Sequence, residues 1–261
     1  MNIVVLIKQV PDTWSERTLS EGDKTLDRAS SDAVLDEINE RAVEEALKIK
    51  EAGGDATVTI LTAGPDRATD AIRKALSMGA DKAVHVNDEA IHGSDAIATA
   101  KVLAKAIGTV GDVDLVLAGN EATDGRSGAM AGMLGELLGW PSLTHANDLS
   151  VTDGTATVKR ETDEGTCDVT ASLPAVVSVG EKINEPRYPS FKGIMAAKKK
   201  PVSTLGIADL GLDASEVGLA GSLVQVDSFA PRPPKSGGQK VEDEGDGGAK
   251  IAEFLVGQKL I

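Results

Sequence analysis

The stretch Ile3-Val4-Val5-Leu6-Ile7-Lys8-Gln9-Val10-Pro11-Asp12 opens with consecutive apolar residues and then turns polar. A short apolar run rich in β-branched side chains is typical of a strand buried on both faces. Further strand patterns occupy 57–62, 83–86 and 114–117, and helical patterns occupy 35–52, 65–78, 95–107 and 128–138. Strands separated by helices of this length predict an α/β fold: a mostly parallel, open, Rossmann-like sheet flanked by helices, with right-handed crossovers.

The second half of the chain has a different pattern. Strand patterns at 151–160, 166–172 and 175–179 predict a small β-rich addition, about 149–180, laid beside the α/β elements within the nucleotide-binding core of residues 1–205. Residues 206–261 form the expected C-terminal arm. Its acidic, glycine-rich run 241–248 predicts a flexible linker over 235–248. The terminal helix expected over 249–261 carries an apolar stripe of Ile251, Phe254, Leu255 and Leu260, and so short a helix must dock on something.

Composition excludes several classes of function. The formal net charge is −14, from 41 acidic and 27 basic side chains, so we expect no binding to nucleic acid. Cys167 is the only cysteine, which rules out an intrachain disulfide and a thiolate metal cluster. Since no apolar run is long enough for a signal peptide or a membrane span, we expect a cytoplasmic protein without membrane insertion.

Three loops follow strands where an open parallel sheet binds its ligands. They are Lys8–Asp12, Thr62–Pro65 and Gly119–Gly128. The last combines small and hydroxyl-bearing residues and leads into a helix, whose backbone amides and dipole favour a phosphate. Asp124 would repel a phosphate, so we expect it to shape the loop or bind a hydroxyl. An ordinary glycine-rich turn remains an alternative, because neither the dinucleotide fingerprint spacing nor a Walker lysine is present.

Catalytic and metal constellations do not emerge from the sequence. His85, His92 and His145 are scattered and do not show metal-ligand spacing. The Gly-x-Ser-x-Gly elbow of serine hydrolases is missing as well. We therefore expect neither catalytic residues nor a metal site in this chain.

An ordered set of short strings over residues 1–205 resembles the electron transfer flavoprotein beta subunit. The strings are Val4–Thr13, Ala42–Leu47, Ala75–Asp81, Asp114–Gly119, Val158–Gly165, Leu173–Ser178, Asn184–Pro189, Gly193–Met195 and Ala197–Pro201. The resemblance implies an electron carrier rather than an enzyme. Such a chain pairs with an alpha subunit that holds FAD, and it contains a structural AMP of its own. Electrons arrive from acyl-CoA or other flavin dehydrogenases and leave to a quinone reductase or another acceptor.

Two alternatives stay open. In an electron-bifurcating relative, a second FAD replaces the AMP and is reduced by NADH. An ATP-hydrolysing or pyrophosphatase-type nucleotide domain is the third possibility, ranked last because Lys8-Gln9-Val10-Pro11 cannot replace a phosphate-chelating Ser-Gly-Gly-x-Asp loop. Aromatic residues make up only 2% of the chain, which favours AMP over a flavin that needs stacking partners.

The resemblance also implies site residues. Those expected to bind the nucleotide are Leu6, Lys8, Asp36, Asn39, Ala63, Gly64, Gly119, Asp124, Gly125, Ser127, Gly128, Ala129 and Met130. The sequence departs from the family pattern at Asp36–Asn39, where Asn-Pro-x-Asp is common, and at Asn120-Glu121, where a cation followed by Gln is usual. The loss of that cation makes the loop less positive. A third departure is Cys167, near where Glu or Gln is usual.

Residues 184–195 resemble the family's recognition loop, which docks the dehydrogenase. Its expected contact residues are Asn184, Glu185, Pro186, Arg187, Tyr188, Phe191, Ile194 and Met195. Phe191 stands where the family more often has a leucine anchor. An exposed ring suits an interface anchor, whereas a loop folded onto the core would bury it. The basic run 198–200 is either a solvated face or a steering patch for an acidic partner.

Overall fold

The computed structural model describes residues 1–53, 55–234, 237–238 and 240–261. They form two compact units, Met1–Asp227 and Ser228–Ile261. The first unit is longer than the core of 1–205 expected from the sequence, because Ile207, Leu210 and Val217 are buried in it.

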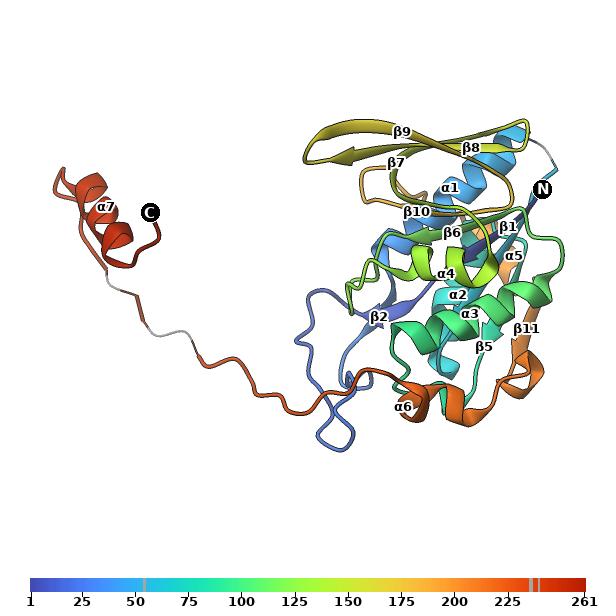
Figure 1. Ribbon diagram of the computed structural model, residues 1–261, viewed down its shortest axis with the longest axis horizontal. Helices are drawn as coiled ribbons and strands as arrows, with labels where there is room; N and C mark the ends of the chain where they lie inside the picture. Colours follow the sequence, from blue (N-terminus) through green and yellow to red (C-terminus); the bar gives the residue numbers. More distant parts are fainter. Residues whose placement is uncertain (54, 235–236, 239) are drawn as a thin grey trace. The chain divides into compact units, whose positions relative to one another are not determined.

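A single sheet organises the first unit (Figure 1). Within the described residues it has nine strands in the order β11-β5-β4-β1-β6-β10-β7-β8-β9. Its parallel strands are β1 (Asn2–Leu6), β4 (Thr57–Ala63), β5 (Lys82–Val86), β6 (Leu115–Gly119), β10 (Ala175–Val179) and β11 (Val202–Leu205), and β7 pairs parallel with β10. The predicted α/β fold with a mostly parallel sheet is thus confirmed.

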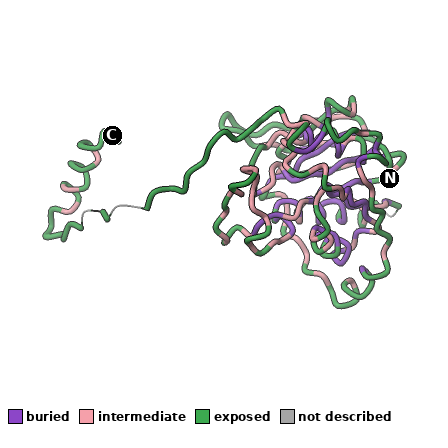
Figure 2. The backbone as a smooth tube through the Cα atoms, turned by 90° about the horizontal axis from the view of Figure 1, so that it is seen from below, coloured by how far each residue is buried: buried purple, intermediate pink, exposed green. Residues whose placement is uncertain are grey.

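Helices cover both faces of this sheet. Alternate side chains of a strand point to opposite faces, so Ile3 and Val5 pack toward α1 (Glu37–Gly53) and α2 (Thr69–Met78). Val4 and Leu6 pack toward α3 (Ala96–Val110) and α4 (Met130–Leu138). In Figure 2 the buried residues, coloured purple, are concentrated in the interior of this unit. Short 3-10 turns, η1 (Asp66–Ala68) and η2 (Glu89–Ile91), precede α2 and α3.

The predicted β-rich section is present, but it is continuous with the main sheet and does not lie beside it. Strand β10 lies inside the main sheet between β6 and β7, because all of its residues are buried. The sheet then continues through β7 (Ser142–Thr152), β8 (Thr155–Thr162) and β9 (Gly165–Ser172). β8 pairs antiparallel with both β7 and β9. β7 begins seven residues before the expected start of this section at 149. Asp153 and Gly154, with φ of 51° and 73°, make the tight hairpin turn between β7 and β8.

Other elements appear where the sequence pattern was irregular. Strands β2 (Gln9–Pro11) and β3 (Ala33–Leu35) pair antiparallel and frame an excursion of residues 12–32. Helix α5 (Phe191–Ala197) begins within the segment 184–195, for which the sequence pattern predicted no helix. Beyond β11 follow η3 (Ala208–Leu210), η4 (Ala214–Glu216) and α6 (Gly218–Gly221).

The second unit contains helix α7 (Gly247–Gly257), which starts and ends earlier than the expected 249–261. Ile251, Phe254 and Leu260 of the predicted stripe are exposed in this chain, and Leu255 is half-buried. Positions 235, 236 and 239 of the expected linker lie outside the described residues. Among the helices of the described part, none combines the length and the apolar character needed to cross a bilayer.

Candidate nucleotide site and recognition loop

The topology of the sheet switches between β1 and β6. From β1 the chain moves to β4 and β5 on one side, while β6 and β10 lie on the other side. The carboxyl ends of parallel strands flanking such a switch form the usual ligand crevice. Leu6 ends β1 and Gly119 ends β6, so the structure brings Leu6, Lys8 and the loop 119–130 to one edge.

Asp36 joins the start of α1 to this loop. One carboxylate oxygen, Oδ1, accepts the backbone N–H of Ile38 at 3.0 Å and of Asn39 at 3.1 Å, which caps the helix. The other oxygen accepts the N–H of Thr123 at 2.7 Å and its hydroxyl at 2.9 Å. The backbone N–H of Asp36 donates to Lys8 O at 3.0 Å. Asp36 is fully buried, so its charge is balanced by hydrogen bonds that fix three segments together.

Asp124 is the second link between these segments. Its carboxylate lies 2.8 Å from Lys8 Nζ and 2.7 Å from Arg28 Nη2, and its side chain is only 1% exposed. Burial raises the pKa of Asp124, but the two cations outweigh burial and hold the pKa below its usual value. Burial of the amine lowers the pKa of Lys8, against the attraction of Asp124. The geometry gives Asp124 a role in shaping the loop.

Close packing surrounds the end of β6. A Cβ added at Gly119 would lie 2.6 Å from Asn39 Nδ2 and 3.0 Å from the backbone oxygen of Glu121. Asn39 is therefore packed directly on the loop. Ala63 and Gly64 end β4, and the hydrogen bonds of Gly64 run to β5: its N–H donates to Val86 O at 3.0 Å, and its carbonyl lies 2.9 Å from His85 Nε2.

The loop ends at the N-terminus of α4. Gly128 has φ of +63°, a conformation that favours glycine, and Gly125 and Ser127 precede it in the loop. Ala129 occupies the N-cap position and offers no side-chain hydrogen bond to the first turn, which begins at Met130. The amides of that turn are thus directed out of the helix at the sheet edge, as a phosphate site requires.

Three arginines and a threonine complete the site, and the sequence reasoning missed them. Arg17 Nη1 donates to Thr123 O at 2.6 Å, and Arg67 donates through Nη1 and Nη2 to the backbone carbonyls of Arg28 and Ser31. Among the described residues, Arg17 Nε and Arg28 Nη1 are buried without a hydrogen-bond partner. Arginines in the long excursion of an otherwise acidic chain were the signal that could have identified Arg17 and Arg28.

Glu121 of the loop lies near a cation of the same loop. Glu121, which stands where the family usually has Gln, lies 3.5 Å from Arg126 Nη1. Next to it, Asn120 lines a polar cavity of about 400 Å³ with His145, Asn147, Glu161 and Lys182. Asn120 Oδ1 is buried there without a partner within the described residues.

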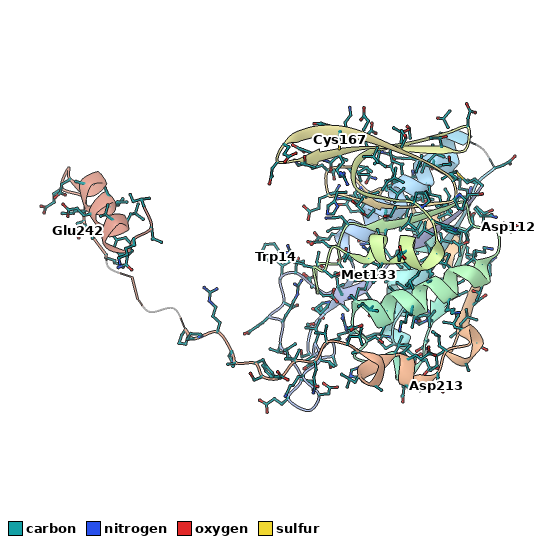
Figure 3. The ribbon with its side chains drawn as sticks, viewed as in Figure 1. Trp14, Asp112, Met133, Cys167, Asp213 and Glu242 are labelled. Atoms are coloured by element: carbon teal, nitrogen blue, oxygen red, sulfur yellow. The ribbon has the colours of Figure 1, made fainter. Side chains whose placement is uncertain are left out.

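Trp14 projects from the excursion with 95% of its surface exposed (Figure 3).

The segment 184–195, which resembles the recognition loop, carries exposed apolar and aromatic side chains. Tyr188 is 97% and Phe191 81% exposed, and Ile194 and Met195 are about half exposed. The alternative in which Phe191 is buried on the core is therefore wrong. Arg187, by contrast, faces inward onto α1. In the part of the chain that the structure describes, no cluster of three or more His, Cys, Asp or Glu is arranged to hold a metal.

Comparison with known proteins identifies the family. Residues 23–210 match the electron transfer flavoprotein domain family. The chain is 60% identical over 264 residues to the electron transfer flavoprotein subunit beta of Mycobacterium tuberculosis, covering 100% of this chain and 99% of that protein. It is 35% identical over 271 residues to the subunit beta of Megasphaera elsdenii, with both chains fully covered.

A further relative is the caffeyl-CoA reductase-Etf complex subunit CarD of Acetobacterium woodii, 36% identical over 242 residues, which cover 92% of each chain. The family match over residues 23–210 includes α1, β6 and the segment 184–195. The chain belongs to the electron transfer flavoprotein family, as a beta subunit.

Proposed function

We propose that this chain binds one AMP between the carboxyl ends of β1 and β6, in a structural role. The observation that carries the proposal is the N-terminus of α4, which lacks a side-chain cap and lies at the topological switch of the sheet. A phosphate there accepts from the amides that follow Gly128, and the helix dipole stabilises its charge. Lys8, Arg17 and Arg28 add positive potential beside the loop.

The buried groups of the site suit a nucleotide. The partnerless Arg17 Nε and Arg28 Nη1 are donors that an anion or a ribose hydroxyl can satisfy. At the end of β6, the polar side chain of Asn39 packs directly against Gly119. Ala63 and Gly64 supply small residues at the end of β4. The residues held by Asp36 and Asp124 thus form a cradle whose shape is set before the ligand arrives.

The AMP-bearing chain then pairs with an alpha subunit that carries FAD, as the family implies. The heterodimer takes electrons from acyl-CoA or other flavin dehydrogenases and passes them to a quinone reductase or another acceptor. The FAD supplies the redox chemistry, while this chain positions the partner subunit and the dehydrogenase. The exposed stripe of α7 is a candidate contact for the alpha subunit, and the exposed side chains of 188–195 are candidates for the dehydrogenase. We propose that the heterodimer transfers electrons in the cytoplasm.

The test is to purify the chain together with its alpha subunit and to quantify bound nucleotides per heterodimer. One FAD and one AMP are expected. A heterodimer that retains one FAD and no adenine nucleotide besides it would contradict the AMP proposal. Loss of AMP on substitution of Arg28 by Met, with FAD retained, assigns the AMP to this chain.

Electron bifurcation is the second candidate. It is favoured by the similarity to CarD, which belongs to a reductase–Etf complex, and by the polar cavity beside Asn120, which adjoins the loop. In that case the heterodimer contains two FAD and no AMP, and NADH bleaches one of the two flavins. The scarcity of aromatic side chains favours AMP.

A further inference from the structure

Arg187 is bound to two glutamates of helix α1. Its Nε and Nη2 donate to the two oxygens of Glu44 at 2.8 and 3.0 Å, and its backbone N–H donates to Glu44 Oε2 at 3.1 Å. Nη2 also donates to Glu51 Oε2 at 3.0 Å, and Nη1 contacts the other oxygen of Glu51. These two forked pairs fix the guanidinium in one orientation.

Asn184 adds a second tie to the same helix. Its Nδ2 donates to Arg41 O at 3.0 Å and to Glu45 Oε2 at 2.9 Å, and Arg41 donates back to Asn184 O. Glu44 and Glu45 are both buried, with 6% and 5% exposure. Buried carboxylates need partners, so α1 and the segment 184–187 depend on one another.

The far end of the segment is held by α2. A Cβ on Gly193 would lie 2.3 Å from the backbone oxygen of Ser77, so α5 rests directly on α2. Lys200 Nζ donates to Leu76 O at 2.9 Å and to Ala80 O at 2.6 Å, which caps the C-terminus of α2. The segment 184–200 is thereby fixed at both ends.

Between these ties lie Tyr188, Phe191, Ile194 and Met195, which we call the 188–195 surface. All four are exposed although they are apolar or aromatic. An untethered apolar segment would cover part of this surface by folding onto the core. Side chains held in place before binding spare the entropy of ordering them in the complex.

We propose that Arg187 is a positioning residue: through Glu44 and Glu51 it holds the 188–195 surface in the conformation that docks the dehydrogenase. The inference rests on the proposed docking role of this surface. It assigns Arg187 an action through α1, whereas the resemblance implied contact with the partner. The hydrogen bonds from Arg187 hold the pKa of Glu51 below its usual value.

The experiment uses the heterodimer, a medium-chain acyl-CoA dehydrogenase and octanoyl-CoA, with reduction of the heterodimer's FAD as the signal. Arg187→Gln is expected to raise the KM for the heterodimer roughly tenfold, which corresponds to about 1.4 kcal/mol, and to change kcat less than about twofold. Hydrogen exchange in 184–195 is expected to accelerate in the free variant, while its AMP and FAD contents stay at the wild-type level.

Four further variants make the result specific. Glu51→Gln should give a smaller rise in KM, and the double variant with Arg187→Gln should be no worse than Arg187→Gln alone, since both act through one pair. Lys105→Met on α3 removes one exposed positive charge from the opposite face and should leave KM unchanged. Arg187→Lys, which keeps the charge but not the fork, should fall between wild type and Arg187→Gln. Arg187→Lys also tests the inference if Arg187→Gln does not fold.

Phe191→Ala separates this inference from the function on which it rests. If Phe191→Ala raises KM and Arg187→Gln does not, the positioning role of Arg187 is wrong and the docking function stands. If neither variant changes KM, both fail. If Lys105→Met raised KM as much as Arg187→Gln does, the inference would also be overturned. That result would show that Arg187 acts only through the net charge of the chain.

Discussion

Asp36 and Thr123 are 87 residues apart in sequence, and one carboxylate oxygen of Asp36 accepts both the backbone N–H and the hydroxyl of Thr123, at 2.7 and 2.9 Å. The other oxygen of Asp36 caps α1. One buried side chain therefore sets the distance between the first helix and the loop that follows β6. The shape of the candidate nucleotide site depends on this carboxylate.

Asp36→Asn is expected to weaken both the fold and nucleotide retention. An amide can accept for the helix cap, but its NH₂ cannot accept from Thr123, so two buried donors lose their partner. We expect a loss of about 2–4 kcal/mol in the free energy of unfolding, and release of AMP from the purified heterodimer. Urea unfolding and nucleotide quantification check the two effects.

Asp95→Asn is the matched control, because Asp95 also caps a helix and also accepts from a distant backbone N–H, that of Leu223 at 2.7 Å. Its hydrogen-bond partners Ser222, Ala98 and Leu223 lie outside the loop 119–130. The control should lower stability and keep the AMP. Equal AMP loss in both variants would show that retention follows global stability and not the Asp36–Thr123 link.

Gly119→Ala should disturb the site through packing. The new methyl would lie 2.6 Å from Asn39 Nδ2 and 3.0 Å from a backbone oxygen, so Asn39 or the loop must move. We expect a destabilisation of about 1–3 kcal/mol, typical of overpacking, together with weaker AMP binding. Thermal unfolding and a nucleotide titration of the stripped heterodimer measure both.

Gly132→Ala on α4 provides the opposite result from the same chemical change. No atom lies within 4 Å of its added methyl, and Gly132 is in a helix. A stabilisation of about 0.4–1 kcal/mol is expected there, with unchanged AMP binding. If Gly119→Ala behaved like Gly132→Ala, the tight contact with Asn39 would be contradicted.

Asp124→Asn should remove a contribution to stability that depends on pH. Because the folded-state pKa of Asp124 is lowered, its carboxylate stabilises the fold fully above its unfolded pKa of about 3.9. This contribution is lost as the pH falls through the lower, folded-state pKa. We expect the variant to be less stable by about 1–3 kcal/mol at pH 7, since Lys8 and Arg28 are only partly shielded from water.

The difference between wild type and Asp124→Asn should shrink as the pH is lowered below about 3.9. Thermal midpoints of both proteins between pH 7 and the onset of acid unfolding test this dependence. Asp70→Asn serves as the control, because Asp70 is 77% exposed and faces only Arg73 at 3.8 Å. A constant difference at every pH would show that Asp124 acts through shape alone.

Gly193→Ala should loosen the attachment of α5. The added methyl meets the backbone oxygen of Ser77 at 2.3 Å, and a backbone atom at the end of α2 cannot move aside cheaply. We expect faster hydrogen exchange across 191–200 and a lower thermal midpoint, from a loss of about 1–3 kcal/mol. Lys192→Ala, at the exposed neighbouring position, should change neither quantity.

The sequence by itself determined the α/β class and most of the strands and helices. The pattern of apolar residues is a local signal, so runs such as Ile3–Ile7 and Ala175–Val179 can be recognised as buried strands from the sequence alone. The loops at the strand ends were found in the same way. The resemblance added the segment 184–195 before any of its contacts were known.

Only the tertiary structure decided which strand lies beside which, and which charges meet. β10 enters the sheet between β6 and β7, although the sequence pattern grouped it with the β-rich section beside the sheet. Arg28 and Asp124 are 96 residues apart, and Arg187 and Glu44 are 143 apart. Burial leaves a periodic trace in the sequence, but a single long-range ion pair leaves none, because its two partners are specified by the folded chain and not by their neighbours.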